Sequence, residues 1–90
     1  ESLSEKAEEL CGKVYQYISV NRLSNVISKI GEVNPKKDFG RILGMYNKDI
    51  LSNFLKEFTE EYNALEKHES KAINKFVNKH ANEVINQYFK

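Results

Sequence analysis

Residues 66–72, which read EKHESKA, separate two long amphipathic stretches of the chain. Residues 48–65 carry apolar side chains at three- and four-residue spacing, and residues 73–89 repeat the same pattern. This spacing predicts an amphipathic helix on each side of the segment. The segment itself holds only small or polar side chains. Whether the chain turns here or continues as one helix therefore decides the fold.

Two arrangements of this region are open. A turn, with Ser70 as the N-cap of the last helix, lets the two apolar stripes face each other in one core. A continuous helix over residues 48–89 would be roughly 63 Å long and would leave both apolar faces without a partner in a monomer. The segment lacks Gly and Pro, which argues against a turn. However, the two stripes point in different directions when projected along one helix, so we favour an antiparallel hairpin.

The first third of the chain predicts two helices. Ser2 and Glu5 fit a capping box ahead of an apolar period that extends to residue 18. Asn21 is a candidate N-cap for a short second helix, and Gly31 stands where a left-handed C-terminal residue belongs.

The middle of the chain predicts one weak and one strong helix. Asn34 is a candidate N-cap for a third segment, in which Gly40 and Gly44 either allow close helix packing or limit the helix to a turn or two. Asn47 is a candidate N-cap for the next helix. The sequence thus predicts an all-α fold, a small bundle of four to five helices in a single domain over residues 1–90, with the last two helices long and amphipathic.

Composition restricts the compartment and the partners. The formal net charge is +1, so no global field drives nonspecific binding to nucleic acid or to anionic membranes. Cys11 is the only cysteine, which excludes an internal disulfide and a cysteine-based zinc site. No apolar run approaches the ~20 residues of a membrane-spanning helix. We therefore expect a soluble, cytoplasmic chain without a transmembrane segment. Because the sequence does not begin with Met, an excised domain or a processed secreted chain stays an open alternative.

Residues that carry catalysis or bind metals do not converge in this sequence. His-Glu-x-x-His and Glu-x-x-His spacings are absent, and no phosphate-binding glycine loop occurs. Cys11 falls on an apolar helix face without a histidine, which favours a small buried residue. His80 lies on an apolar stripe, where a boundary residue is commoner than a pH switch or a ligand. The sequence predicts no enzyme activity, no cofactor, and no catalytic, cofactor-binding or metal-binding residue.

The expected role is therefore binding to another macromolecule. The chain has more aromatic and aliphatic positions than a core of this size encloses, and exposed apolar surface marks an interface. This favours a non-catalytic protein-binding module, such as an adaptor, an immunity- or antitoxin-like inhibitor or an assembly subunit. We expect another protein as the partner, with a weak homodimer as a further option. The expected anchors are aromatic residues of the last two helices, namely Tyr62, Tyr88 and Phe89.

A regular row of lysines supports a second interpretation. Lys71, Lys75 and Lys79 recur every four residues. A row of asparagines accompanies them, formed by Asn74, Asn78, Asn82 and Asn86. The favoured interpretation pairs the lysines with acidic residues of the preceding helix, at ~0.3–0.5 kcal/mol per exposed pair. Those acidic residues are Glu57, Glu60 and Glu61.

The alternative is a nucleic-acid-binding surface. The lysine row would bind phosphates, and exposed Tyr15 or Tyr17 would stack on bases. Three further cations would contribute if the third helix lies alongside, namely Lys36, Lys37 and Arg41. The chain has only two arginines, although arginine is preferred for bidentate contacts to phosphate and guanine.

Overall fold

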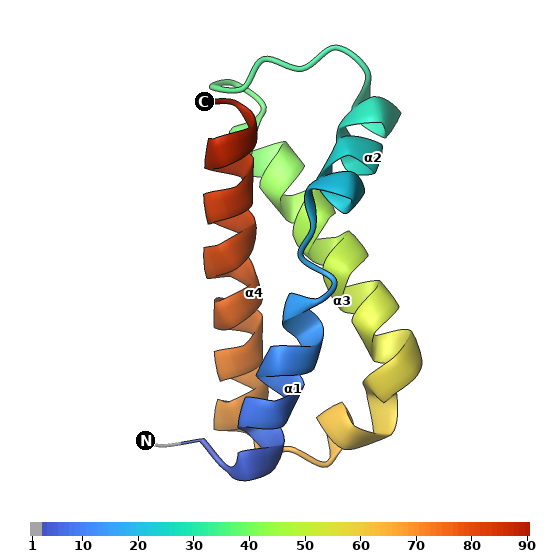
Figure 1. Ribbon diagram of the computed structural model, residues 1–90, viewed down its shortest axis with the longest axis vertical. Coiled ribbons are helices and arrows are strands. Elements are labelled where there is room, and N and C mark those ends of the chain that lie inside the picture. The colour runs from blue at the N-terminus through green and yellow to red at the C-terminus, as the bar shows by residue number, and fades with distance from the viewer. Residues whose placement is uncertain (1–2) are drawn as a thin grey trace.

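Four α-helices make up the fold in a computed structural model of the protein, which describes residues 3–90. They are α1 (Glu5–Tyr15), α2 (Val20–Ile30), α3 (Phe39–Asn63) and α4 (Lys67–Tyr88). Helices α3 and α4 run antiparallel, and α1 and then α2 pack along this pair (Figure 1). The described residues contain no strand. The predicted all-α bundle with two long final helices is confirmed.

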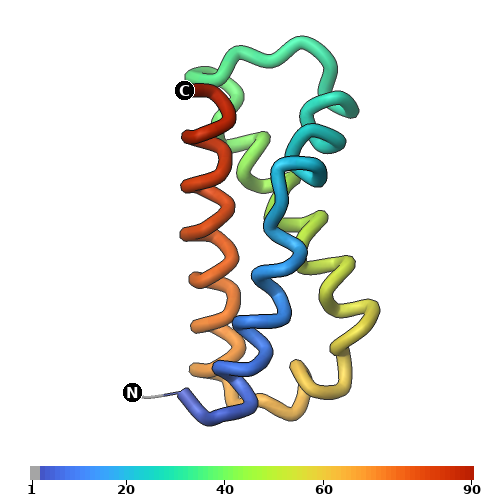
Figure 2. The backbone as a smooth tube through the Cα atoms, viewed as in Figure 1, coloured from blue at the N-terminus to red at the C-terminus, as the bar shows by residue number. Residues whose placement is uncertain are grey.

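A turn between α3 and α4 confirms the hairpin. Helix α3 ends at Asn63 and α4 begins at Lys67. The backbone reverses direction between them at one end of the molecule (Figure 2). The longest dimension of the fold is 40 Å, well short of the roughly 63 Å expected for one continuous helix.

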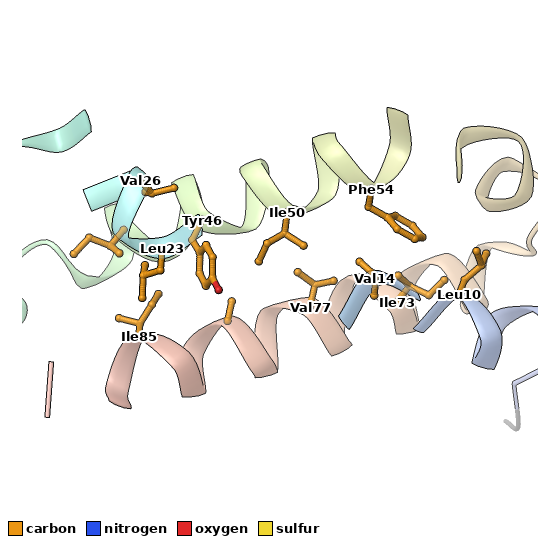
Figure 3. Packing of buried hydrophobic residues seen from close by; sticks show 12 residues of the cluster. Leu10, Val14, Leu23, Val26, Tyr46, Ile50, Phe54, Ile73, Val77 and Ile85 are labelled. Carbon is orange, nitrogen blue, oxygen red and sulfur yellow. The ribbon is translucent and has the colours of Figure 1, made fainter. Parts of the chain in front are cut away.

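The core lies between α3 and α4. Figure 3 shows Tyr46, Ile50 and Phe54 of α3 reaching toward α4. The facing residues of α4 are Ile73, Val77, Ala81 and Ile85. Helices α1 and α2 close the core with Leu10, Val14, Leu23 and Val26. The two apolar stripes therefore share one core, as the hairpin requires.

Helix α4 begins one turn earlier than the sequence predicts. Its N-cap is Glu66, whereas the predicted cap, Ser70, lies inside the helix. Glu66 and Glu69 form a capping box, in which the Glu69 carboxylate accepts from the Glu66 N–H at 3.4 Å. The same carboxylate accepts from the Ser4 N–H at 2.9 Å. Because these glutamates satisfy free N–H groups one turn before Ser70, the helix starts there.

Glu69 makes the stability of the fold depend on pH. Its hydrogen bonds from Ser4, above all, lower the pKa of Glu69 from its ordinary value of 4.5. Because the folded pKa is lower than the unfolded one, the stabilisation is complete above pH ~4.5 and is lost as the pH falls through the folded pKa. We expect Glu69→Gln to be less stable than the wild type at pH 7. We also expect it to lose less stability on acidification.

Urea unfolding followed by circular dichroism at pH 7 and at pH ~3 measures both effects. The matched control is Glu60→Gln, which removes one carboxylate from an exposed position of α3. Superimposable unfolding curves for Glu69→Gln and the wild type at pH 7 would show that the Glu69 hydrogen bonds do not stabilise the fold.

Helix α3 is continuous over two segments that the sequence predicts as separate helices. Its buried residues repeat every four positions from Ile42 through Tyr46 and Ile50 to Phe54. The apolar stripe therefore continues past Asn47, which lies within the helix and is not a cap. The predicted cap Asn34 precedes only a short turn, in which its side chain accepts from two following backbone N–H groups. A Cβ at Gly40 or Gly44 would meet open space, so neither glycine serves close helix packing.

Serine residues cap the first two helices. The hydroxyl of Ser4 accepts from the Ala7 N–H at 3.2 Å at the start of α1. The predicted cap Ser2 lies outside the described residues. Helix α2 ends at Gly31, as predicted, with a positive φ of 91° that favours glycine.

Helix α2 starts after Ser19 and not at the predicted cap, Asn21. The Ser19 hydroxyl accepts from the Arg22 N–H at 3.3 Å. Its carbonyl accepts from the buried Tyr46 hydroxyl at 2.7 Å. Burial raises the pKa of Tyr46 to about 12, so this donor keeps its proton at neutral pH. A contact with α3 therefore fixes the residue that caps α2.

An ion pair also ties α2 to α3. Arg22 Nη1 lies 3.3 Å from Asp49 Oδ2, and the guanidinium lies over the ring of Tyr17 at 5.2 Å. The Asn53 amide donates to the other Asp49 oxygen at 3.2 Å. Helix α2 is thus held by charge and hydrogen bonds as well as by its apolar side.

Candidate nucleic-acid interface

Helix α4 has three rows of side chains along its length: a mostly apolar buried row, an asparagine row and a row of lysines. Because residues four apart share a side of a helix, each type forms a row. The buried row consists of Glu69, Ile73, Val77, Ala81 and Ile85. The asparagine and lysine rows predicted from the sequence occupy two other sides, and their contacts differ.

The asparagine row faces α3. Asn47 of α3 donates its amide N–H to Asn78 Oδ1 at 2.9 Å. The Tyr62 hydroxyl, also from α3, donates to Asn74 Oδ1 at 3.2 Å. The other two asparagines of the row hydrogen-bond to each other. Asn74 and Asn78 therefore link α4 to α3, whereas Asn82 and Asn86 bond within α4. All four side chains already have hydrogen-bond partners in the protein.

The predicted lysines lie on the side of α4 opposite its buried row. Lys71, Lys75 and Lys79 are all exposed. Within residues 3–90, none of their ammonium groups has a carboxylate within 4.0 Å. The expected pairing with the acidic residues of α3 is absent, because the asparagine row and not the lysine row faces that helix. Glu57, one of those acidic residues, instead accepts a hydrogen bond from the Tyr17 hydroxyl.

Lys67 extends the row by one turn. It is exposed and is the first residue of α4, four positions before Lys71. From here on, the lysine row includes Lys67 as well as the predicted Lys71, Lys75 and Lys79. It extends about 18 Å along the helix at 1.5 Å per residue. Lys67 already fits the four-residue period of the lysines in the sequence, but with Ser70 as the predicted N-cap it lies outside the predicted helix.

The second predicted group of cations lies at the other end of the molecule. Lys36, Lys37 and Arg41 are exposed around the start of α3. Figure 1 shows this end of α3 beside the C-terminal end of α4. Lys36 lines a pocket of about 620 Å³ together with Asn86 and Phe89. Because Lys79 precedes Asn86 by about 10 Å along the helix, the two basic groups are separate.

The three predicted aromatic anchors differ in exposure. Tyr62 is half-buried, with its ring 6.4 Å from that of Phe54. Phe89 is half-buried and packs against the core. Tyr88 is 41% exposed. Of the three predicted anchors, Tyr88 is therefore the most exposed.

Tyr15 and Tyr17 also differ. The Tyr17 ring is half-buried and packs edge-on against Phe54. Tyr15 is 53% exposed, and its ring packs edge-on against His80 at 5.3 Å. His80 is half-buried, as expected of a boundary residue, and its Nδ1 lies 3.0 Å from Glu83 Oε1. Of the two tyrosines, Tyr15 is the one that can stack on a ligand.

Further properties of residues 3–90 concern metal binding, thiol reactivity and membrane spanning. In residues 3–90 there is no group of three or more His, Cys, Asp or Glu side chains arranged to hold a metal ion. Cys11 is half-buried, and burial raises the pKa of its thiol, which disfavours the reactive thiolate. None of the helices in this part of the chain is long and apolar enough to span a membrane.

Comparison with known proteins corrects the predicted function. The family model described as T4 RNA ligase 2 C-terminal matches residues 1–83, and no solved structure matches the chain. The expectations of a non-catalytic protein-binding module and of no enzyme activity are therefore wrong, because the matching family is part of an RNA ligase. The match does not confirm a protein as the first partner. The short motifs sought in the sequence do not reveal this match, which extends over most of the chain. Since the match covers most of the chain, the protein belongs to the T4 RNA ligase 2 C-terminal family.

Proposed function

We propose that residues 1–90 form a single RNA-binding domain of an RNA ligase and that the lysine row contacts the RNA backbone. One observation carries this proposal: four exposed lysines lie on one side of α4 without a carboxylate partner in residues 3–90. Membership of an RNA ligase family supports RNA as the polyanion. The nucleic-acid-binding alternative from the sequence thus becomes the leading interpretation.

The chemistry of the lysine row suits phosphate binding without base selection. Neighbouring lysines are spaced about 6 Å apart along the helix, and each flexible side chain can reach a separate phosphate. Contacts to phosphate fix the position of a strand but carry no sequence information. Because the net charge is only +1, binding depends on this local row and not on a general positive field.

The salt dependence of RNA binding tests the proposal. Four phosphate contacts to a single strand predict that log K falls with log salt at a slope of about −3. Fluorescence anisotropy with an end-labelled single-stranded RNA, between about 50 and 200 mM salt, measures this slope. The proposal fails if no binding occurs at the lowest salt, or if the affinity is independent of salt.

Other expectations from the sequence stay predictions. These are a contribution of Lys36, Lys37 and Arg41 to RNA binding, a weak homodimer and a cytoplasmic location. The position of the three cations at the far end of α4 supports the first, because a strand that follows the helix beyond the lysine row approaches the start of α3.

A further inference from the structure

We propose that a pocket beside the lysine row binds an unpaired nucleobase that carries an exocyclic amino group. The pocket lies between the C-terminal half of α4 and the junction of α1 with α2. This inference rests on the proposed function, since it names what an RNA strand would place next to the lysines.

Exposed apolar side chains, of a kind that a small domain usually buries, line the pocket. Its volume is about 480 Å³, within the range of small-molecule sites. The large apolar side chains that are exposed in residues 3–90 are Tyr15, Val20 and Tyr88, at 53%, 56% and 41%. All three line this pocket, although they come from three different helices. Such clustering indicates a binding site, whereas scattered exposed apolar residues would need no explanation.

Two of these side chains are aromatic rings already held in position. Tyr15 packs edge-on against Phe76 at 6.1 Å and against His80 at 5.3 Å. Tyr88 packs edge-on against Phe89 at 5.1 Å. A ring supported in this way loses little freedom when a base stacks on it. Aromatic rings beside a positively charged track are the usual means by which proteins hold single-stranded nucleic acid.

Polar groups on the α4 side of the pocket favour a base over a phosphate or a lipid. His80, Glu83 and Gln87 line that side, and Glu83 is held by His80 at 3.0 Å. A carboxylate accepts from the amino group of cytosine, and a glutamine amide pairs with the edge of adenine. Uracil has no exocyclic amino group and can donate only its single ring N–H. The negative charge of Glu83 repels a phosphate from the pocket itself.

The position of the pocket matches the end of the lysine row. Glu83 follows Lys79 by four residues, one turn or about 6 Å further along the same side of α4. Figure 1 shows the connection between α1 and α2 beside the middle of the α3–α4 pair. An RNA strand with its phosphates on the lysine row therefore meets the pocket next, where an unpaired base can enter.

Titration with free nucleosides tests the pocket without involving the lysine row, because nucleosides carry no phosphate. We expect adenosine to shift the NMR resonances of Tyr15, His80 and Tyr88, and uridine at equal concentration to shift them less. Absence of any adenosine response at these residues, or an equal response to both nucleosides, would overturn the proposal. The pocket would then be a contact for another protein surface or an unused hollow.

Substitution of Tyr15 and Tyr88 tests whether the pocket contributes to the affinity for RNA. We expect Tyr15→Ala with Tyr88→Ala to weaken binding of adenine-rich single-stranded RNA about tenfold or more, with the salt slope unchanged. The matched control is Tyr15→Phe with Tyr88→Phe, which keeps both rings and should bind like the wild type. Circular dichroism checks that each variant is folded. If the alanine variant does not fold, the adenosine titration of the wild type tests the base pocket instead.

The outcomes separate this inference from the proposed function. Wild-type affinity in a folded alanine variant overturns the base pocket and leaves the lysine row intact. Absence of salt-dependent RNA binding by the wild type overturns the lysine row. In that case an adenosine response still supports the pocket, and its absence overturns the pocket as well.

Discussion

Glutamine at all four positions of the lysine row is expected to lower the affinity for single-stranded RNA by two to three orders of magnitude at ~0.1 M salt. Each lysine–phosphate contact releases about 0.7 counterion from a single strand, which at this salt is worth roughly a factor of five. The salt slope should fall toward zero in parallel. Anisotropy titrations of Lys67→Gln, Lys71→Gln, Lys75→Gln and Lys79→Gln, combined in one variant, measure both quantities.

The chain offers a matched control for the loss of charge. Four other exposed lysines lie on α1, α2 and α3, namely Lys6, Lys29, Lys48 and Lys56. Their combined change to glutamine alters the net charge equally but leaves the lysine row in place. We expect this control to retain most of the affinity and the salt slope. Equal losses in the two variants would mean that total charge, and not the row, binds RNA.

The lysine variant is also expected to stay folded. The four side chains point away from the buried row of α4 and have no ion-pair partner within residues 3–90. Glutamine has nearly the helix propensity of lysine. A loss of affinity without a loss of helicity would therefore report on binding and not on folding.

Phe54→Ala is expected to destabilise the domain by about 3–5 kcal/mol. Phe54 is fully buried, and its ring lies 5.2 Å from that of Phe58 and 6.2 Å from that of Tyr17. Truncation leaves a cavity between the two long helices, where the backbone cannot readily collapse. A domain of this size is stable by only about 5–13 kcal/mol, so the variant would lose a large part of its stability.

Urea unfolding of Phe54→Ala against the wild type measures this loss. Lys56→Ala is the control, because Lys56 is exposed on the same helix two residues later, and we expect a change within about 0.5 kcal/mol. A loss below about 1 kcal/mol for Phe54→Ala would show that the core between α3 and α4 repacks around the missing ring.

Much of the fold follows from local patterns. The apolar periods on either side of residues 66–72 predict α4 and the C-terminal part of α3, and their differing directions favour the hairpin. Gly31 ends α2 as expected because a positive φ suits glycine. Helix starts are less predictable, since several polar residues near each start can cap it. Contacts made elsewhere select Ser19 and Glu66 as caps: Tyr46 binds the Ser19 carbonyl, and Ser4 binds the capping-box carboxylate.

The candidate site, like the fold, is only partly predictable from the sequence. The sequence by itself determines that the lysines share one side of a helix, because that depends only on the helical period. It does not determine which neighbour each side faces. Only the tertiary structure turns Asn74 and Asn78 toward α3. It also leaves the lysine row without an acidic partner among residues 3–90. Only the tertiary structure brings Tyr15, Val20 and Tyr88 into one pocket, because residues so distant in the chain meet through helix packing that no local pattern encodes.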